Sequence, residues 1–311
     1  MNFELCLTFP PNILRKVRED AARRFPGMEL TEPDTHQEMF DFASSFGEGE
    51  PPALTVTAYP QVALHALRLA GEGRLAKPDK KSPQRPEYAR LGLAAPTEEI
   101  CLLAVIPVIL AAGPECAPRL RDWTDLCAPD FPGPIGCPPP DTPMPYLAEA
   151  VLRRSAGEEV KNFLRKLDTG SNPIDINKRL GRGELKAALN IPAFAGAFRE
   201  GPAAMIWPAS GALAVPLFGC LAWDAPDEAH AALDYFLSED FQNFMAAEGM
   251  LAPIHPQAKG FAELEDNNWK MLWPGWNLLF EIARDMIRSS QENSPPKPPQ
   301  HFSAAMRLKK T

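Results

Sequence analysis

Four side chains able to contact a small molecule follow expected strands near the N-terminus. Phe9 and Asn12 follow the first strand, and Thr57 and Tyr59 lie at the end of the third. Ligands of open α/β sheets bind beyond the carboxyl ends of the parallel strands, so we predict that these residues contribute to a ligand site. Two alternatives stay open, because Asn12 could cap the following helix and Tyr59 could be packed with its hydroxyl at the surface.

A second group of polar and small residues lies in the middle of the chain. Asp141 and Thr142 follow a strand-like segment and precede a helix, where an N-cap pair is the ordinary interpretation. Trp207, Ser210 and Gly211 end another expected strand in a turn of small residues, which suits a close approach of the backbone. Trp207 could simply be a core residue, but Ser210 is polar, and packing in an apolar core does not explain its position. We therefore predict ligand contacts at this turn as well.

The chemically reactive side chains are not arranged as an active site. The five histidines are scattered without metal-ligand spacing, and Gly181 and Gly183 are too few to cradle a phosphate. Nucleophile-elbow, Walker and dinucleotide-binding motifs are absent from the sequence. We expect no catalytic residue, no cofactor and no metal site. The enzymatic alternative is a cysteine-dependent activity of Cys137, which lies close to Asp141 in the sequence.

The state of the six cysteines is related to the compartment in which the protein is found. No two of the six form a C-x-x-C pair, and buried free thiols are the expected state. If the protein is exported, a disulfide between two of Cys116, Cys127 and Cys137 is an alternative. A zinc site built from these three is a further alternative, although their spacing matches no standard zinc pattern. The six are Cys6, Cys101, Cys116, Cys127, Cys137 and Cys220.

Length and charge limit the class of protein and its partners. The chain of 311 residues is long enough for two lobes, and its formal net charge is -8. An acidic surface does not attract phosphate backbones, so nucleic acid is not an expected partner. Ile100–Ala112 is too short to span a bilayer, and prolines and glycines interrupt Ala203–Trp223, so no transmembrane segment is expected.

The N-terminal residues do not have the pattern of a signal peptide. From Phe3 to Phe9 apolar and other residues alternate, as in a half-buried strand, and no basic segment precedes an apolar core. Two placements follow from this pattern. Either a leader was removed and the protein is periplasmic, or the protein stays in the cytoplasm.

Strand and helix patterns alternate along the chain and would position these residues. Three strand–helix units in the first part predict a mostly parallel sheet with helical crossovers. The apolar stretch Ile100–Leu110 predicts a strand buried on both faces, with Pro107 at a bulge or an edge. The expected strands are Phe3–Phe9, Met28–Thr31, Ala53–Tyr59, Ile135–Cys137, Ala203–Trp207 and Ala212–Ala222.

The expected helices follow from apolar stripes and start signals. They begin at Pro11, at a capping box of Thr35 with Glu38, at Pro60, at Arg119, before Leu147, at a capping box of Ser155 with Glu158, at Asp227 and at Trp276. The tail from Ser289 to Thr311 has no core-forming pattern and is expected to be mobile.

Two blocks of the sequence resemble the type II periplasmic binding proteins, which are the extracellular solute-binding subunits of ABC importers. Pro118–Pro140 is similar to the segment after the first hinge crossing of the iron-type branch. In Ala204–Gly249 one strand ends in Trp-Pro-x-x-Gly, and the next leads into Ala-Pro-Asp-Glu-Ala and a helix. The order of elements matches over most of residues 1 to 260, but only these two blocks are distinctive.

The resemblance implies an α/β fold of two lobes, each a mostly parallel sheet flanked by helices, joined by hinge strands around a ligand cleft. Lobe one would be residues 1–103 with 213–311, and lobe two residues 104–212. It also implies that Asp141 and Thr142 contact the ligand. Ferric-binding members carry adjacent tyrosines at the place of Ile191–Glu200, where this chain has Phe194 and Phe198. We therefore do not expect the usual phenolate iron site.

The function that the resemblance implies is capture of a small anionic or metal-bearing solute for an ABC permease, by a monomeric protein that is not an enzyme. The absence of a signal-peptide pattern and the free cysteines motivate an alternative, a cytoplasmic sensor or sequestering protein on the same fold. An enzyme on this fold is the third hypothesis.

Overall fold

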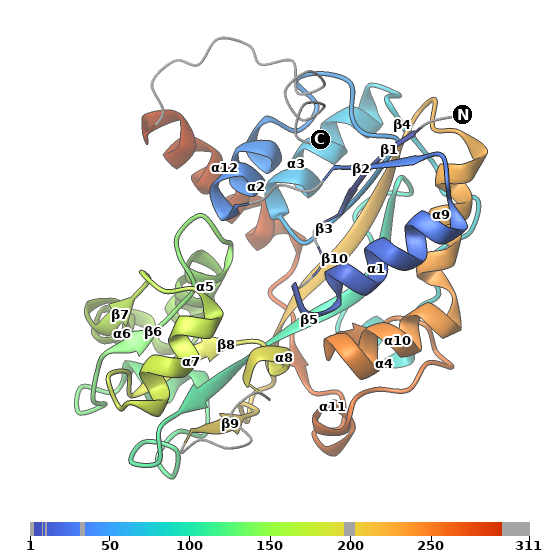
Figure 1. Cartoon of the computed structure of the whole chain (residues 1–311). Coiled ribbons are helices and arrows are strands. Elements are labelled where there is room, and N and C mark those ends of the chain that lie inside the picture. The colour runs from blue at the N-terminus through green and yellow to red at the C-terminus, as the bar shows by residue number, and fades with distance from the viewer. Residues whose placement is uncertain (1–2, 8, 10, 32–34, 196–202, 294–311) are drawn as a thin grey trace, which may run out of the picture.

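The computed structural model describes residues 3–7, 9, 11–31, 35–195 and 203–293. Figure 1 shows two lobes on either side of two long strands, β5 (Ile100–Ala112) and β10 (Ala212–Ala222). Lobe one is the part that contains the N-terminal strands, and lobe two is the part that contains the short strands of the middle of the chain. The expected α/β class with two lobes is confirmed.

Lobe one is built on a sheet with the strand order β2-β1-β3-β10-β5. β1 (Phe3–Leu7) lies parallel to both β2 (Met28–Thr31) and β3 (Leu54–Thr57), because a helix carries the chain back after each strand. The expected strand–helix units are thus confirmed. The helices of this lobe include α1 (Pro11–Arg24), α2 (His36–Ser45), α3 (Pro60–Gly71), α9 (Asp227–Leu237) and α10 (Glu239–Gly249).

Lobe two is built on three short strands in parallel. β6 (Ile135–Gly136) lies between β7 (Leu167–Asp168) and β8 (Ala187–Asn190), and the pairing is parallel on both sides. β8 and β9 (Ala204–Ile206) pair antiparallel with the end of β5. The helices of this lobe are α5 (Met144–Ala156), α6 (Val160–Lys166), α7 (Pro173–Gly181) and α8 (Pro192–Ala195).

β5 belongs to both lobes. Its first part pairs with β10 as far as Val108, and its last four residues, from Ile109, pair with β8. Pro107 pairs with Ala214 of β10, and among the described residues no strand pairs with it on the opposite side. Pro107 therefore lies at a local edge, as expected, where the missing N–H leaves no hydrogen bond unmade.

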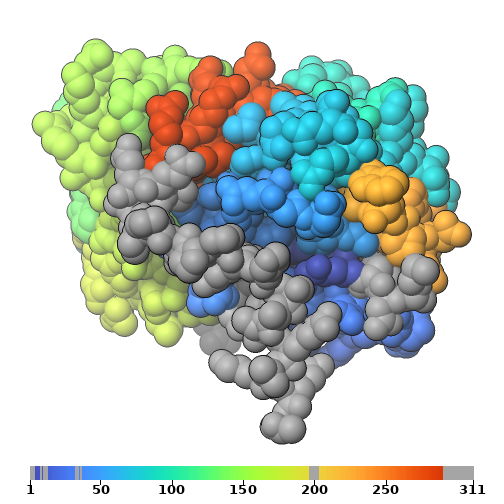
Figure 2. All heavy atoms as spheres, turned by 90° about the horizontal axis from the view of Figure 1, so that it is seen from above, coloured from blue at the N-terminus to red at the C-terminus, as the bar shows by residue number. Residues whose placement is uncertain are grey.

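The last helix, α12 (Trp276–Asn293), contacts α2 and α3 of lobe one and α5 of lobe two. Figure 2 shows it, in red, between the green surface of lobe two and the blue and cyan surface of lobe one. Its buried Leu278, Leu279 and Ile282 share an apolar cluster with residues of lobe two. Because α12 packs on both lobes, the predicted residue limits of the lobes stay a prediction.

Short elements complete the fold. They are β4 (Leu75–Ala76), α4 (Pro86–Arg90), the 3-10 helices η1 (Trp123–Cys127) and η2 (Gly157–Glu159), β11 (Ala252–Pro253), α11 (Ala262–Asp266) and β12 (Met271–Leu272). Within the described residues, no helix combines the length and the apolar character that a membrane span requires.

Two predicted helix starts are wrong. The helix expected from Arg119 begins only at Trp123, because Asp122 caps η1 there and Asp125 completes a capping box. Ser155 does not start a helix with Glu158. It lies in the last turn of α5, where its hydroxyl donates to the carbonyl of Val151 at 3.2 Å. Ser155 and Glu158 have the spacing of a capping box, but α5 continues through Ser155 and ends at Ala156.

Candidate functional site

The carboxyl ends of the parallel strands define the candidate site. β1 and β3 end in lobe one at Leu7 and Thr57, and β6 ends in lobe two at Gly136. The two sets influence each other, because the negative charge of Asp141, after β6, contributes to the raised pKa of Tyr59, after β3. We call this pair the Tyr59–Asp141 site. It joins two residues from different lobes, at the strand ends where the α/β rule places a ligand.

Tyr59 is held by the junction between β3 and α3. Its N–H donates to the Oγ1 of Thr57 at 3.2 Å, and Pro60 starts the helix directly after it. The side chain is 9% exposed, and its hydroxyl makes no hydrogen bond to another described residue. Burial, and next the negative charge of Asp141, raise the pKa of Tyr59, so the phenol stays protonated. It is therefore a neutral donor that a ligand can use.

Asp141 and Thr142 precede α5, but they do not cap it. The N-cap position belongs to Pro143, without a side-chain cap bond, so the N-cap alternative is wrong. The Thr142 hydroxyl donates to the carbonyl of Pro139 at 2.7 Å, and this bond shapes the loop. Asp141 is half-buried beside it. The loop is rich in proline, which lacks the N–H that an anion would need, so Asp141 gives it an acceptor character.

Two of the other predicted residues of lobe one, Phe9 and Thr57, are buried. Phe9 is buried against the rings of Phe236 and Phe241, with centroid distances of 5.9 and 6.1 Å. Thr57 is fully buried. α1 begins at Pro11, one residue before Asn12, so Asn12 is not at the N-cap position of that helix. The side chain of Asn12 lies outside the described residues.

Gln61 is a polar residue of the first turn of α3 that the sequence analysis missed. Its side chain is fully buried, and neither its Nε2 nor its Oε1 has a hydrogen-bond partner among the described residues. A buried amide without partners is unfavourable, so Gln61 is an unusual residue at this position of the helix. The available signal was a glutamine directly after Tyr59 and Pro60, before the apolar Val62 and Ala63.

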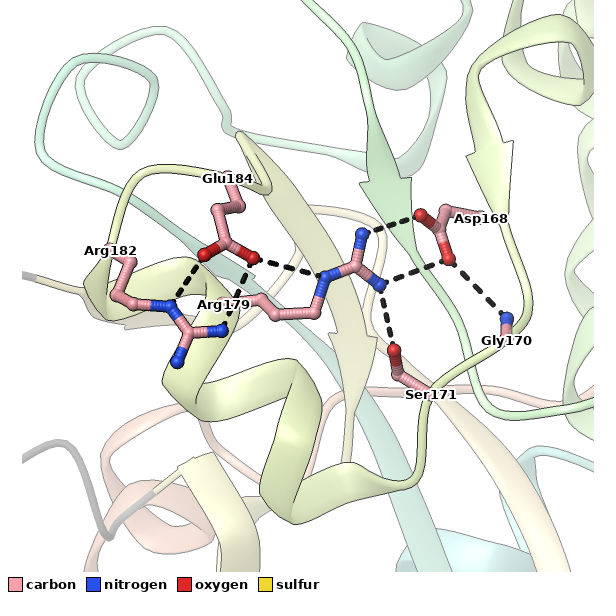
Figure 3. A network of polar contacts seen from close by, with 6 residues as sticks. All are labelled: Asp168, Gly170, Ser171, Arg179, Arg182 and Glu184. Carbon is pink, nitrogen blue, oxygen red and sulfur yellow. Dashed lines mark hydrogen bonds and ion pairs between the residues drawn. The ribbon is translucent and has the colours of Figure 1, made fainter.

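The connection from β7 to α7 is a second feature that the sequence analysis missed. Figure 3 shows the guanidinium of Arg179 between the carboxylates of Asp168 and Glu184. Arg179 donates to both carboxylate oxygens of Asp168, at 3.1 and 2.6 Å, and to the hydroxyl of Ser171 at 2.7 Å. The hydrogen bond from Arg179 holds the pKa of Asp168 below its usual range. This network connects β7 and the loop that follows it to α7.

The end of β8 is also polar. Asn190 is 1% exposed, and its side chain donates to Asn177 and accepts from the N–H of Ile191, both at 2.9 Å. Phe194, half-buried in α8, lies in the stretch where ferric-binding relatives are expected to carry tyrosines. Phe198 lies outside the described residues. The described part of this stretch therefore offers no phenolate oxygen.

The predicted turn from Trp207 to Gly211 lies at the connection between the lobes. Ser210 donates from its hydroxyl to Asp122 at 2.6 Å, and its N–H donates to the same oxygen at 3.2 Å. Trp207 donates from Nε1 to the carbonyl of Lys270 at 2.8 Å. The polar side chains of the turn are thus used by protein contacts. This finding explains Ser210, which has a structural partner 88 residues away in sequence.

Gly211 is required by the close contacts of this turn. Its φ is +116°, and a Cβ at this position would lie 2.7 Å from the backbone carbon of Met271. Its carbonyl accepts a hydrogen bond of 2.8 Å from the Nε1 of the buried Trp123. The expected close approach of the backbone is present, but the approaching group is the segment at Met271.

The cysteines are all free and buried, as expected. Burial raises the pKa of Cys101 and Cys127 to about 11, and it raises that of Cys137 as well. A nucleophilic cysteine needs a lowered pKa and access to substrate, so the environment of Cys137 does not support a thiol-dependent activity. Within the described ranges, histidine, cysteine and acidic side chains do not gather in groups of three that could hold a metal ion.

Two surface pockets lie elsewhere in the chain. One, of about 270 Å³, lies under the segment between β4 and β5, and the other, of about 250 Å³, lies between Gly113 and α7. Neither is lined by any of the nine predicted ligand-binding residues. The strand ends combine a phenol and a carboxylate, which suits binding of a polar solute.

Comparison with solved structures finds the same fold in bacterial binding proteins. The ferric binding protein from Campylobacter jejuni has a TM-score of 0.72 and 14% identity, over 94% of this chain and 99% of that one. Iron-bound HitA from Pseudomonas aeruginosa has a TM-score of 0.70 and 18% identity, over 93% and 99%. AfuA from Actinobacillus pleuropneumoniae, with fructose-6-phosphate bound, has a TM-score of 0.67 and 12% identity, over 94% and 98%.

Comparison of the sequence itself gives the family. No curated protein matches the chain significantly. The family model for bacterial extracellular solute-binding proteins matches residues 66–280, which are more than half of the chain. The resemblance seen in the sequence is therefore confirmed, and the chain belongs to the bacterial extracellular solute-binding protein family.

Proposed function

We propose that this protein captures a small polar solute at the Tyr59–Asp141 site and delivers it to an ABC-type permease outside the cytoplasm. The observation that carries the proposal is the neutral phenol of Tyr59 near the carboxylate of Asp141, contributed by different lobes. A solute that contacts both residues joins the lobes. A permease can recognise the joined form, since closure converts binding into a change of shape.

We further propose that the solute carries positive charge, either as a bound metal ion or as a cationic group. Asp141 is an acceptor, and its negative charge contributes to the raised pKa of Tyr59. A buried carboxylate favours a cation beside it and disfavours an anion. Of the two solute classes expected from the sequence, the metal-bearing class therefore fits the site better than a simple anion.

The test is a binding measurement with three solutes of different charge. Ferric citrate, spermidine and fructose 6-phosphate are titrated against the purified chain by calorimetry, with native mass spectrometry of the untreated protein to find a solute that copurifies. We expect spermidine, or the ferric ion supplied by ferric citrate, to bind and fructose 6-phosphate not to bind. Binding of fructose 6-phosphate alone would contradict the proposed charge of the solute.

Substitutions locate the bound solute. Asp141→Asn removes the charge and is expected to weaken binding about tenfold or more, whereas Tyr59→Phe removes one neutral hydrogen bond and should weaken it about fivefold. Asp130→Asn is the matched control, because Asp130 is an exposed aspartate of lobe two. Equal affinity in Asp141→Asn and Asp130→Asn would show that the solute binds elsewhere.

A further inference from the structure

A pocket of about 270 Å³ lies in lobe one, under the segment that connects β4 to β5. The residues that line it fall between Lys77 and Leu102, with Ile254 added from the segment after β11. None of them belongs to the Tyr59–Asp141 site or to lobe two. In Figure 2 this part of the chain, in cyan, lies at the molecular surface. The pocket is therefore separate from the place where the proposed solute binds.

Two hydroxyl groups of the pocket are buried without a partner. The Oη of Tyr88 and the Oγ1 of Thr97 have no hydrogen bond to any described residue. Tyr88 is only 1% exposed, and burial raises its pKa, so the phenol stays protonated and can donate. Buried hydroxyls are nearly always hydrogen-bonded in folded proteins. A molecule in the pocket that accepts hydrogen bonds would satisfy both groups.

The remaining lining is mostly apolar. Leu93, Ile100 and Ile254 line the pocket and are exposed by no more than 2%. Apolar walls with a few polar groups are typical of sites for small organic molecules. The ligand therefore needs an apolar body as well as an acceptor.

The charges at the rim of the pocket favour an anion. Lys77 is paired with Glu98 at 2.6 Å, and Lys80 is paired with Asp234 at 2.6 Å. Lys81 lines the same pocket and makes no salt bridge within the part of the chain that the structure describes. The charge of Lys81 also acts on Glu98, so the lining carries three lysines and one glutamate as its charged side chains. An acceptor with negative charge, such as a carboxylate, fits this rim.

Hydrogen bonds to the body of the lobe hold the segment over the pocket. The hydroxyl of Ser82 donates to the carbonyl of Leu102 in β5 at 3.0 Å, and within the segment itself Gln84 donates to the carbonyl of Leu93 at 2.7 Å. The indole of Trp276 donates to the carbonyl of Ala94 at 2.6 Å. The pocket is therefore formed before a ligand enters, which lowers the entropic cost of binding.

We propose that this pocket binds a small monocarboxylate with an apolar body, as a second ligand site of the protein. The carboxylate accepts hydrogen bonds from Tyr88 and Thr97, and Lys81 balances its charge. The apolar body packs against Leu93 and Ile100. The proposal does not depend on the solute of the Tyr59–Asp141 site.

The test uses 4-iodobenzoate, whose iodine can be located directly. The full chain is crystallised with this probe, and the anomalous signal of iodine is measured. We expect one iodine peak in the pocket under the segment between β4 and β5. A peak only near Tyr59 and Asp141 would overturn the proposal. So would a pocket that holds only ordered water on Tyr88 and Thr97 at a saturating concentration of the probe.

Binding in solution gives the second measurement. Tyr88→Phe and Thr97→Val are each expected to lower the affinity for 4-iodobenzoate about fivefold. 4-Iodobenzyl alcohol should bind to the wild type about tenfold more weakly than the acid. Tyr88→Phe removes a hydroxyl without a partner, so its melting temperature should be unchanged or higher. Tyr146→Phe, in α5 of lobe two, is the control and should not change the affinity. Unchanged affinity in both Tyr88→Phe and Thr97→Val would overturn the proposal.

Discussion

The turn from Trp207 to Gly211 and the Tyr59–Asp141 site differ in how far their polar groups are used by the protein. In the turn, Ser210 and Trp207 both make short hydrogen bonds within the chain. Two residues after Tyr59, in contrast, the buried amide of Gln61 has no hydrogen-bond partner among the described residues. The turn is distinctive in sequence because the connection between the lobes needs it. The site differs because it combines a phenol and a carboxylate that come from different lobes.

The largest expected effect comes from Gly211→Ala, which breaks the turn. The new Cβ would lie 2.7 Å from the backbone of Met271, in a backbone region that only glycine enters easily. We expect a loss of about 3 kcal/mol in the free energy of unfolding, measured by urea denaturation. Gly73→Ala is the matched control for positive φ, since nothing lies near its Cβ position. An equal loss in both variants would show that the contact with Met271 is not important.

A smaller effect is expected from Asp122→Ala. This change removes the partner of Ser210 and the cap of η1 together, and should lower the free energy of unfolding by about 2 kcal/mol. Ser210→Ala should lower the free energy of unfolding by about 1 kcal/mol, because it removes only one of these contacts. Solute affinity should stay within about twofold in both variants if the turn is structural. A loss of affinity in Ser210→Ala without a loss of stability would make Ser210 a ligand residue after all.

The effect of Asp168→Asn on the free energy of unfolding is expected to depend on pH. The pKa of Asp168 is lowered in the folded state by Arg179, so its contribution to stability is present above the unfolded pKa and is lost as the pH falls through the folded one. The free energy of unfolding of the wild type should exceed that of the variant by about 1 kcal/mol at neutral pH, and this difference should shrink below about pH 3.9. Chemical denaturation at several pH values measures the difference. A constant difference from pH 7 to pH 2 would contradict the role of Arg179.

The smallest expected effect is the reaction of the cysteines with a thiol reagent. All six are free and buried, and burial raises the pKa of Cys220 to about 12. We expect almost no reaction with Ellman's reagent in the native protein at pH 8, and six reactive thiols after denaturation. Fast reaction of one native thiol would show an accessible cysteine that the structure does not have.

The sequence predicted the features that depend on local pattern. The strand–helix units, the proline at the start of α3 and the block around β10 have local signals, and the structure confirms them. Contacts between distant residues could not be predicted, because no local pattern encodes them. The contact of Ser210 with Asp122 and the proximity of Tyr59 to Asp141 both depend on how the lobes assemble. Gln61 was missed for the same reason, since only the packed structure shows its amide to be buried without partners.

Hydrogen–deuterium exchange with and without a solute that binds tests the central claim most directly. If the solute lies between the lobes, amide protection should rise together in the segment around Tyr59 and in the loop around Asp141. The turn at Ser210 should change little, because its hydrogen bonds already exist without ligand. Protection confined to one lobe, or to the segment between β4 and β5, would contradict capture at the Tyr59–Asp141 site.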